Sequence, residues 1–336
     1  MTTGPDAAVL AAWLAETVDP AISSACVTRL TGGHSSGAWR VDVAVGEVSR
    51  TVVLKAPNEP SVVFRRDTGR EARIIDAVGR MGAPVPKVVA IDDGTRVGHP
   101  CFVMEHVEGR SLADASPGGC HDDAWLHDVG PEAQRAVWNS FHDALATLHR
   151  VDAAKVPDAS HGTRGVIDVL AYWRHALLDA APTETVPRQL ARLDWLHDHV
   201  PSRADDDPAV CMGDARLANC LVAGTDVCAL VDFEIAYIGN PAADVGYSVF
   251  FEMLQCRSAT RPLTGFPSAD ETWARWAEMT GRDIDDRDYW TAFGAMMLSI
   301  TATRAMIQWG LSGAAVESDN PVVAEWETTI ETAASR

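Results

Sequence analysis

The chain has 336 residues, of which 47% are hydrophobic and 22% charged, values typical of a folded globular protein rather than a disordered one. Its 28 basic and 47 acidic residues give a net charge of −19, which argues against partners such as nucleic acid or an anionic membrane surface. Seven cysteines without a C-x-x-C pair argue against a disulfide framework and against a zinc site, so we expect a cytoplasmic protein.

Residues 1–18 predict an amphipathic helix and not a signal peptide, because they lack a basic segment and carry Asp6 and Glu16. No apolar run approaches the roughly 20 residues that cross a bilayer. Alternating apolar and polar residues over 26–55 then predict strands. The glycine-rich GGHSSG (32–37) falls between two of these strands, where a hairpin would lie.

A helix is predicted over 67–82, and two further strands over 85–94 and 99–111. Helical periodicity dominates from about residue 130, and strand-like sequence returns only at 209–233. Because strands and helices are segregated along the chain and do not alternate, the pattern predicts an α+β protein.

The length and this segregation predict two lobes. We expect a small β-rich lobe over 1–105, a short link near Glu105–Arg110, and a larger, mostly helical lobe over 106–336. The first lobe holds 11 basic and 12 acidic residues, whereas the second holds 17 basic and 35 acidic residues. The acidity of the second lobe either keeps it soluble or indicates that it receives a cation, such as a metal ion or a cationic substrate.

The helical lobe contains an unusual stretch, VCMGDARLANCLV (210–222), which sets Asp214, Arg216 and Asn219 among apolar residues. Asp and Asn most often cap local turns, so this stretch alone is not diagnostic. Asp232 follows an apolar run eighteen residues after Asp214, and a short hairpin over 221–231 would separate the two. Oxygen ligands on adjacent loops suit Mg²⁺, whose other positions go to phosphate and water. A carboxylate not used for the metal could orient or deprotonate a hydroxyl.

The β-rich lobe supplies two complementary residues. Lys55 ends the apolar strand VVLK, and Glu71 lies sixteen residues later in the next predicted helix. A strand lysine paired with a glutamate of the following helix positions nucleotide phosphates in kinases. Taken alone, a lysine at a strand end is more often a solvated tip.

In order and spacing, these motifs resemble the aminoglycoside phosphotransferase and choline kinase-like family, which has the protein-kinase fold. GDARLAN (213–219) is similar to the catalytic loop of that family, and VDFEIAYIGNPAADVGY (231–247) is similar to its metal-binding segment. ETWARWAEMTGRDIDDRDYW (271–290) is similar to one subgroup, whose phosphotransferase domain is joined to acyl-CoA dehydrogenases in some larger proteins. The resemblance covers nearly the whole chain.

The resemblance implies a bilobal protein-kinase-like fold and a role for each residue of the helical lobe. Asp214 would hold or deprotonate the acceptor hydroxyl, and Asn219 and Asp232 would hold Mg²⁺ on the β- and γ-phosphates. Arg216 would neutralise the moving phosphoryl group, a role that suits a fixed guanidinium fork. Asp244 is interpreted as a structural anchor of the catalytic loop.

For the β-rich lobe, the resemblance implies that Lys55, fixed by Glu71, holds the α- and β-phosphates of ATP. GTP is the alternative donor, because the link residues do not decide the base. The other cofactor-binding residues that it implies, in the hairpin and at the link, are Gly33, Ser35, Ser36, Met104, Glu105 and Val107.

The sequence departs from the family pattern at two positions. Met212 stands where the family usually has a histidine that braces the loop, a change that bears on loop geometry more than on chemistry. Asn240 stands where an aspartate is common, which weakens it as a metal ligand. We interpret His149 as a helix-end or surface residue.

Two classes of function follow from the resemblance. The first is an ATP-dependent O-phosphotransferase that acts on a small-molecule hydroxyl, and the second is a nucleotide-binding regulatory pseudokinase without turnover. The complete set of residues for phosphate and metal favours the enzyme. The subgroup resemblance indicates a hydroxylated acyl metabolite as acceptor, whereas the acidic lobe indicates a cation such as an aminoglycoside-like compound.

Overall fold

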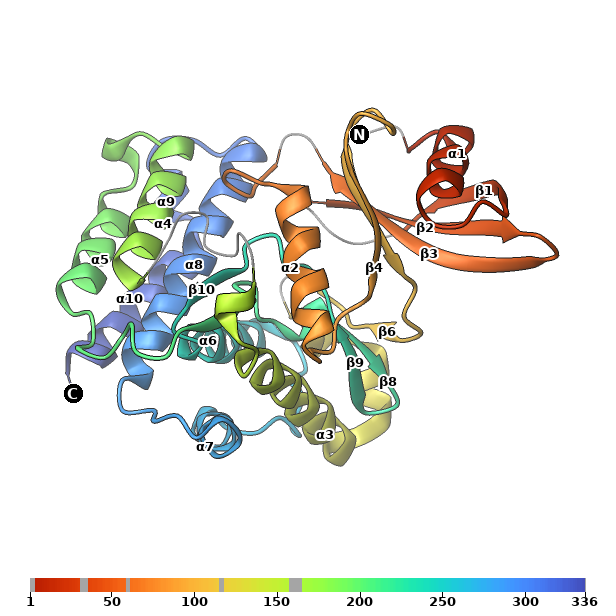
Figure 1. Ribbon diagram of the computed structural model, residues 1–336. Helices are drawn as coiled ribbons and strands as arrows, with labels where there is room; N and C mark the ends of the chain where they lie inside the picture. The colour runs from red at the N-terminus through yellow and green to blue at the C-terminus, as the bar shows by residue number, and fades with distance from the viewer. Residues whose placement is uncertain (1–3, 31–35, 59–60, 115–117, 157–164, 336) are drawn as a thin grey trace.

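The structure, a computed structural model, describes residues 4–30, 36–58, 61–114, 118–156 and 165–335. It divides into a β-rich N-lobe and a larger helical C-lobe, as the sequence predicts (Figure 1). The N-lobe elements are α1 (Ala7–Thr17), β1 (Ile22–Arg29), β2 (Ser36–Val45), β3 (Val48–Pro57), α2 (Thr68–Arg80), β4 (Val88–Asp93) and β5 (Pro100–Glu105). Two predicted hairpin residues, Gly33 and Ser35, lie outside the described residues, whereas Ser36 opens β2.

Side chains alternate between the two faces of the N-lobe sheet, and each face packs on a different helix. Among the described residues, five antiparallel strands lie in the order β1-β2-β3-β5-β4. On β5, Cys101 and Val103 join the apolar cluster of α1, whereas Phe102 joins that of α2 and the C-lobe. Lys55 of β3 is directly opposite Phe102, so both lie on the same face. Strand register therefore directs this lysine toward α2 and the C-lobe.

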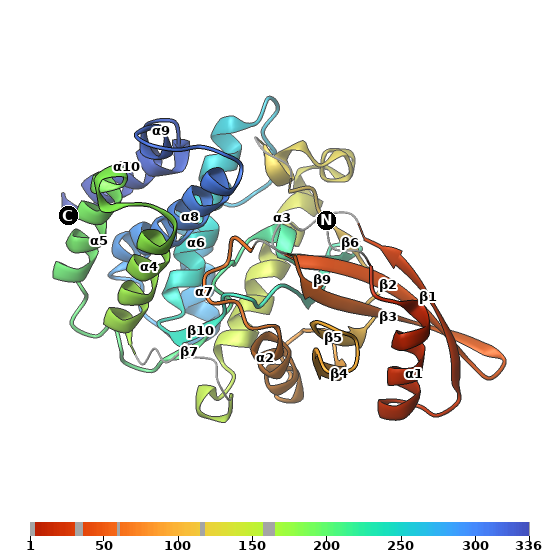
Figure 2. The same cartoon turned by 90° about the horizontal axis from the view of Figure 1, so that it is seen from above.

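The C-lobe is built around three helices. Its elements are β6 (Arg110–Ser111), α3 (Ala124–His149), α4 (Val166–Ala180), α5 (Pro187–Asp198), β7 (Ala209–Cys211), β8 (Cys220–Ala223), β9 (Asp226–Leu230), β10 (Tyr237–Gly239), α6 (Ala242–Ser258), α7 (Ala269–Thr280), α8 (Arg287–Gln308), α9 (Ala315–Ser318) and α10 (Pro321–Ala334). Helices α3, α6 and α8 supply much of the apolar core, and α5 and α10 lie on the side farthest from the sheet (Figure 2). In the described segments, no helix combines the length and the apolar character needed to cross a bilayer.

Short strands frame the predicted catalytic loop. β7 pairs with β10, and β8 pairs with β9 to form the predicted hairpin, with β6 added at its edge. The strand predicted over 99–111 is in fact two strands, β5 and β6, separated by the link, and the sequence pattern misses β10, because three residues are too few to show alternation. It also places the start of α3 too late, since Gly130, with a φ of 80°, and Pro131 interrupt the helical periodicity.

Candidate active site

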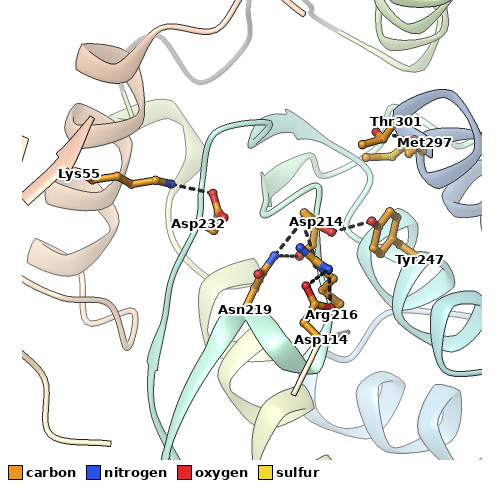
Figure 3. A network of polar contacts seen from close by, with 9 residues as sticks. All are labelled: Lys55, Asp114, Asp214, Arg216, Asn219, Asp232, Tyr247, Met297 and Thr301. Atoms are coloured by element: carbon orange, nitrogen blue, oxygen red, sulfur yellow. Dashed lines mark hydrogen bonds and ion pairs between the residues drawn. The ribbon is translucent and has the colours of Figure 1, made fainter. Parts of the chain in front are cut away.

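The hairpin β8–β9 brings the two polar loops of the C-lobe together. The first loop runs from Met212 to Asn219 and ends in a short 3₁₀ turn, η4 (Leu217–Asn219), and the second follows β9 at Asp232. The backbone N–H of Val231 donates to the carbonyl oxygen of Asn219 at 2.9 Å, which fixes one loop against the other. Residues far apart in sequence therefore face one shared region (Figure 3).

Asp244, in the first turn of α6, holds the start of the catalytic loop. Its carboxylate accepts hydrogen bonds from the backbone N–H of Met212 at 2.6 Å and of Gly213 at 2.9 Å. Gly213 has a φ of 84°, and a Cβ there would lie 2.5 Å from the carbonyl oxygen of Ile235, so the tight turn requires glycine. These contacts are those of the structural anchor that the sequence suggested.

The interpretation of His149 as a helix-end or surface residue is half right. The residue ends α3, but its side chain is buried, with Nε2 3.1 Å from a carboxylate oxygen of Asp244. The indole N–H of Trp276 donates to Nδ1 at 3.0 Å, so the neutral ring carries its proton on Nε2 and donates it to Asp244. His149 thus helps to fix the carboxylate of Asp244 through a hydrogen bond, a role that the sequence does not indicate.

The carboxylate of Asp214 receives three donors from the described residues. The hydroxyl of Tyr247 donates to Oδ1 at 2.6 Å. Nε of Arg216 and Nδ2 of Asn219 both donate to Oδ2, at 3.0 and 2.8 Å (Figure 3). Hydrogen bonds to an ionised group are the stronger kind, so the orientation of this carboxylate is well determined.

Arg216 is held between two carboxylates and an aromatic ring. Its Nη1 lies 2.6 and 2.5 Å from the two oxygens of Asp114, and its guanidinium lies over the ring of Phe251 at 5.6 Å. Burial alone would lower the pKa of Arg216, but the charges of Asp214 and Asp114 outweigh it and raise the pKa above its usual value. The guanidinium is therefore a fixed positive charge beside Asp214.

Lys55 lies at the boundary between the lobes, paired with a carboxylate from each. Its Nζ is 2.5 Å from Oε1 of Glu71 and 2.7 Å from Oδ1 of Asp232. Oε1 of Glu71 also accepts the backbone N–H of Phe233 at 3.1 Å, which links α2 to the loop after β9. Burial alone would lower the pKa of Lys55, but Asp232 and Glu71 raise it above the ordinary value, so the ammonium stays charged.

Asp232 occupies a backbone conformation that few side chains adopt. Its φ is 72°, in the left-handed region that Asp and Asn tolerate better than most residues. Burial alone would raise the pKa of Asp232, but Lys55 lowers it below its usual value, which keeps the carboxylate ionised. Glu234 lies two residues later. Its own burial, and to a smaller extent the charge of Asp232, raise the pKa of its carboxyl group to about 7.

The remaining residues predicted at the nucleotide lie along the end of the sheet and the link. Met104 is partly buried on β5, opposite Val53 and Val88 on the neighbouring strands. Glu105 ends β5, and its backbone N–H donates to the carbonyl oxygen of Lys87 at 2.8 Å. Val107 follows in the link and is partly buried. None of the contacts described above ties these three residues to the cluster around Lys55.

Oxygen atoms of Asn219 and Asp232 suit a hard cation such as Mg²⁺. Nδ2 of Asn219 donates to the backbone oxygen and to Oδ2 of Asp214, at 3.0 and 2.8 Å, so its amide oxygen is oriented away as an acceptor. These two residues would offer Mg²⁺ one carboxylate oxygen and one amide oxygen on adjacent loops.

A second group of potential metal ligands does not suit a metal. His121, Glu252 and Cys256 have ligand atoms within 4.8 Å of one another. However, the backbone N–H of Leu263 donates to Nδ1 of His121 at 3.0 Å, so the proton of the neutral ring lies on Nε2. That nitrogen, the one near Glu252, then has no lone pair for a metal.

A family model described as the phosphotransferase enzyme family matches residues 27–282. The chain belongs to this family. It is 27% identical over 259 residues to mouse acyl-CoA dehydrogenase family member 10, an alignment that covers 72% of this chain and 23% of that protein. The chain therefore spans only about a quarter of the length of the curated relatives that it matches.

Solved structures support the kinase-like fold of this phosphotransferase-family chain. A candidate aminoglycoside phosphotransferase from Ralstonia eutropha superposes with a TM-score of 0.74 at 22% identity, covering 99% of both chains. A thermostable mutant of another aminoglycoside phosphotransferase, in a ternary complex with AMP-PNP and hygromycin B, gives a TM-score of 0.60 at 13% identity, covering 98% of this chain and 100% of the other. At these identities the likeness establishes the fold, and the predicted bilobal protein-kinase-like fold is confirmed.

Three residues of this site were not predicted from the sequence. Tyr247 and Phe251 follow Asp244 on α6 at spacings of three and seven, and this helical periodicity could have indicated a shared face. Asp114 lies in a loop with no recognisable motif, 102 residues before its partner Arg216, and nothing in the sequence indicates the pairing.

Proposed function

We propose that this chain is a Mg·ATP-dependent phosphotransferase that acts on a hydroxyl group of a small molecule. The observation that carries the proposal is the convergence of Lys55, Asp232, Asn219 and Asp214 from both lobes. An ammonium, two oxygen ligands for a hard cation and a separate oriented carboxylate are the groups that phosphoryl transfer to a hydroxyl needs. The family membership and the kinase-like fold point the same way.

Five residues have one role each in the proposed reaction. Lys55, fixed by Glu71, binds the α- and β-phosphates of ATP, and Asn219 and Asp232 would hold Mg²⁺, which would neutralise phosphate charge. Asp214 accepts the proton of the acceptor hydroxyl while that oxygen bonds to the γ-phosphorus and the bond to ADP breaks. Asp214 is kept ready for this step by its fixed orientation.

Arg216 has two roles compatible with its position. A guanidinium this close to Asp214 can stabilise the transferred phosphoryl group, as the sequence suggested, because its charge is permanent. Its contacts with Asp114 and Asp214 also support a second role, in which it orients the carboxylate. Both roles lower the barrier of the chemical step and leave ATP binding to Lys55.

The lobes are proposed to divide at residues 105 and 106, with the nucleotide between them. In this arrangement the base lies near Met104, Glu105 and Val107, and the glycine-rich hairpin residues Gly33, Ser35 and Ser36 cover the phosphates. ATP is the proposed donor, in line with the AMP-PNP of the related ternary complex, and GTP is the alternative.

For the acceptor we propose a hydroxylated acyl compound. The related mouse protein is named as an acyl-CoA dehydrogenase family member, which favours this class. Beyond Tyr247, on the side away from Lys55, α8 carries Met297 and Thr301 (Figure 3). Partly buried apolar side chains pack along the same two helices, among them Phe251 and Leu254 of α6. An aminoglycoside-like cation is the second candidate, because the C-lobe is acidic.

Nucleotide binding and turnover separate this proposal from a regulatory pseudokinase. We expect ATP to raise the melting temperature only when Mg²⁺ is present, because binding to the native state stabilises it. We also expect slow release of ADP, which Asp214→Asn abolishes. Stabilisation without ADP release with any acceptor supports the regulatory alternative, and the absence of any nucleotide effect contradicts both functions.

A further inference from the structure

One face of α6 contacts successive residues of the catalytic loop. Asp244, Tyr247 and Phe251 are spaced by three and four residues, which places them on the same side of a helix. Asp244 binds the backbone before the catalytic residue, Tyr247 binds the carboxylate of Asp214, and Phe251 lies under the guanidinium of Arg216. The helix thus supports the loop at three points in register.

Tyr247 is the middle of these contacts and has little freedom to move. The residue is 3% exposed, and its ring lies nearly parallel to that of Phe251, with centroids 6.1 Å apart and an interplanar angle of 8°. Burial, and then the charge of Asp214, raise the pKa of the phenol well above its usual value. The hydroxyl therefore remains protonated and serves as a permanent donor.

The two oxygens of Asp214 are left unequal by their partners. Each carboxylate oxygen offers about two lone-pair sites. Among the described residues, Oδ2 receives two donors, Arg216 and Asn219, whereas Oδ1 receives one donor, Tyr247. The remaining lone-pair site of Asp214 is therefore on Oδ1, beside the phenol.

We propose that Tyr247 is a positioning residue, which orients Asp214 so that Oδ1 accepts the hydrogen of the attacking hydroxyl. The inference rests on the proposed function and adds to it the atom that receives the proton and the residue that selects it. Tyr247 binds one carboxylate oxygen of Asp214, and Arg216 and Asn219 bind the other. The carboxylate therefore cannot rotate without losing at least one of these hydrogen bonds. Phe251 supports the donors on both carboxylate oxygens, because its ring packs on Tyr247 and on Arg216.

The experiment is Tyr247→Phe, which removes one hydroxyl and keeps the ring. The probe is Mg·ATP with water as the phosphoryl acceptor, so that no acceptor need be known. We expect kcat for ADP release to fall by about tenfold to a hundredfold, since misplacing a catalytic group by about 1 Å has effects of this size. The KM for ATP should stay within twofold, because Tyr247 does not belong to the nucleotide site.

The matched control is Tyr289→Phe, which removes another buried tyrosine hydroxyl, one that donates to the carbonyl oxygen of Leu196 at 3.0 Å. This variant should keep kcat within twofold, even if its melting temperature falls as much as that of Tyr247→Phe. A second variant, Phe251→Leu, should lower kcat in the same direction, because it removes the ring under Arg216.

Three outcomes decide the matter. A selective loss of kcat in Tyr247→Phe, with the control unaffected, supports the positioning role. A kcat for ADP release in Tyr247→Phe that stays within twofold of the wild-type value contradicts the inference and leaves the proposed function intact. Wild-type protein that releases no ADP, with water or with any hydroxylated acceptor, contradicts the proposed function, and the inference with it.

Discussion

Nζ of Lys55 lies 2.7 Å from Oδ1 of Asp232, although the two residues are 177 positions apart in the chain. Lys55 lies near the end of β3 in the N-lobe sheet and Asp232 follows a hairpin of the C-lobe, so their contact joins the lobes. Glu71 strengthens the junction, because it binds both Lys55 and the backbone of Phe233. The proposed phosphate-binding and metal-binding groups are thus held together at the boundary between the lobes.

Asp232→Ala should remove the Mg²⁺ dependence of ATP binding. Asp232 would be one of the residues that hold Mg²⁺, which would neutralise the mutual repulsion of the phosphate oxygens. Without it, Lys55 alone would neutralise their charge. Titration calorimetry of ATP with and without Mg²⁺ measures the effect. The control is Asp226→Ala, which removes an exposed carboxylate from the hairpin that precedes Asp232. Equal magnesium dependence in Asp232→Ala and the wild type would show that the metal binds elsewhere.

Glu71→Gln should weaken both stability and nucleotide binding. The substitution keeps an oxygen for the backbone of Phe233 but removes the charge that Lys55 contacts at 2.5 Å. Hydrogen bonds to charged groups contribute about 1.5–3 kcal/mol, and we expect the free energy of unfolding to fall by about this amount. The KM for ATP should rise as well, because Lys55 is then positioned by Asp232 alone. Chemical denaturation and steady-state kinetics measure the two effects, with exposed Glu132→Gln as the control. A variant with unchanged stability and KM would contradict the role of Glu71.

Arg216→Ala should lower kcat by about a hundredfold while changing the KM for ATP little, because a donor that acts mainly at the transition state appears in kcat. Arg216→Lys should recover part of the activity, since lysine supplies the charge but not the planar fork. Asp114→Asn should give a smaller loss, because it weakens one anchor of the guanidinium. If Arg216 instead binds a carboxylate of the acceptor, the acceptor KM rises and kcat survives. A kcat within twofold in Arg216→Ala would contradict both roles proposed here.

Met212→His, which restores the usual residue of the family, should destabilise this protein. The side chain of Met212 is fully buried in the apolar core of the C-lobe. The nearby carboxylate of Asp244 already binds the backbone of Met212 and Gly213 and the ring of His149. An imidazole buried without a partner costs about 1–3 kcal/mol. Thermal unfolding measures the loss, and Met212→Leu should show much less of it. An equal or higher melting temperature for Met212→His would show that the site has partners for the ring.

Much of the architecture could be predicted because it depends on local patterns. Strand alternation and helical periodicity indicate the β-rich lobe, α2 and the long helices of the C-lobe. The motif spacing also indicated residues that lie close together, since Lys55 contacts both Glu71 and Asp232, and Asn219 donates a hydrogen bond to Asp214. In each case a short segment carries the information.

The contacts that support the catalytic loop could not be predicted, because they depend on tertiary packing. In sequence His149 is an ordinary helix end, yet its ring is hydrogen-bonded to Trp276 of α7 and to Asp244 of α6. Asp114 pairs with Arg216 only because β6 adds to the hairpin and brings the following loop near it. Short strands such as β6 leave no periodicity, so the sequence contains no local signal for this contact.

The central claim, transfer of a phosphoryl group from ATP to a hydroxyl, is tested most directly by screening hydroxylated metabolites for ADP release with wild-type protein and Asp214→Asn. We predict at least one acceptor that yields ADP and a phosphate ester in equal amounts, as measured by a coupled assay and phosphorus NMR. Asp214→Asn should lower that turnover by about 10²–10⁴, the usual contribution of a general base, while ATP affinity stays within a few-fold. A validated acceptor whose turnover falls less than threefold in Asp214→Asn would contradict the account.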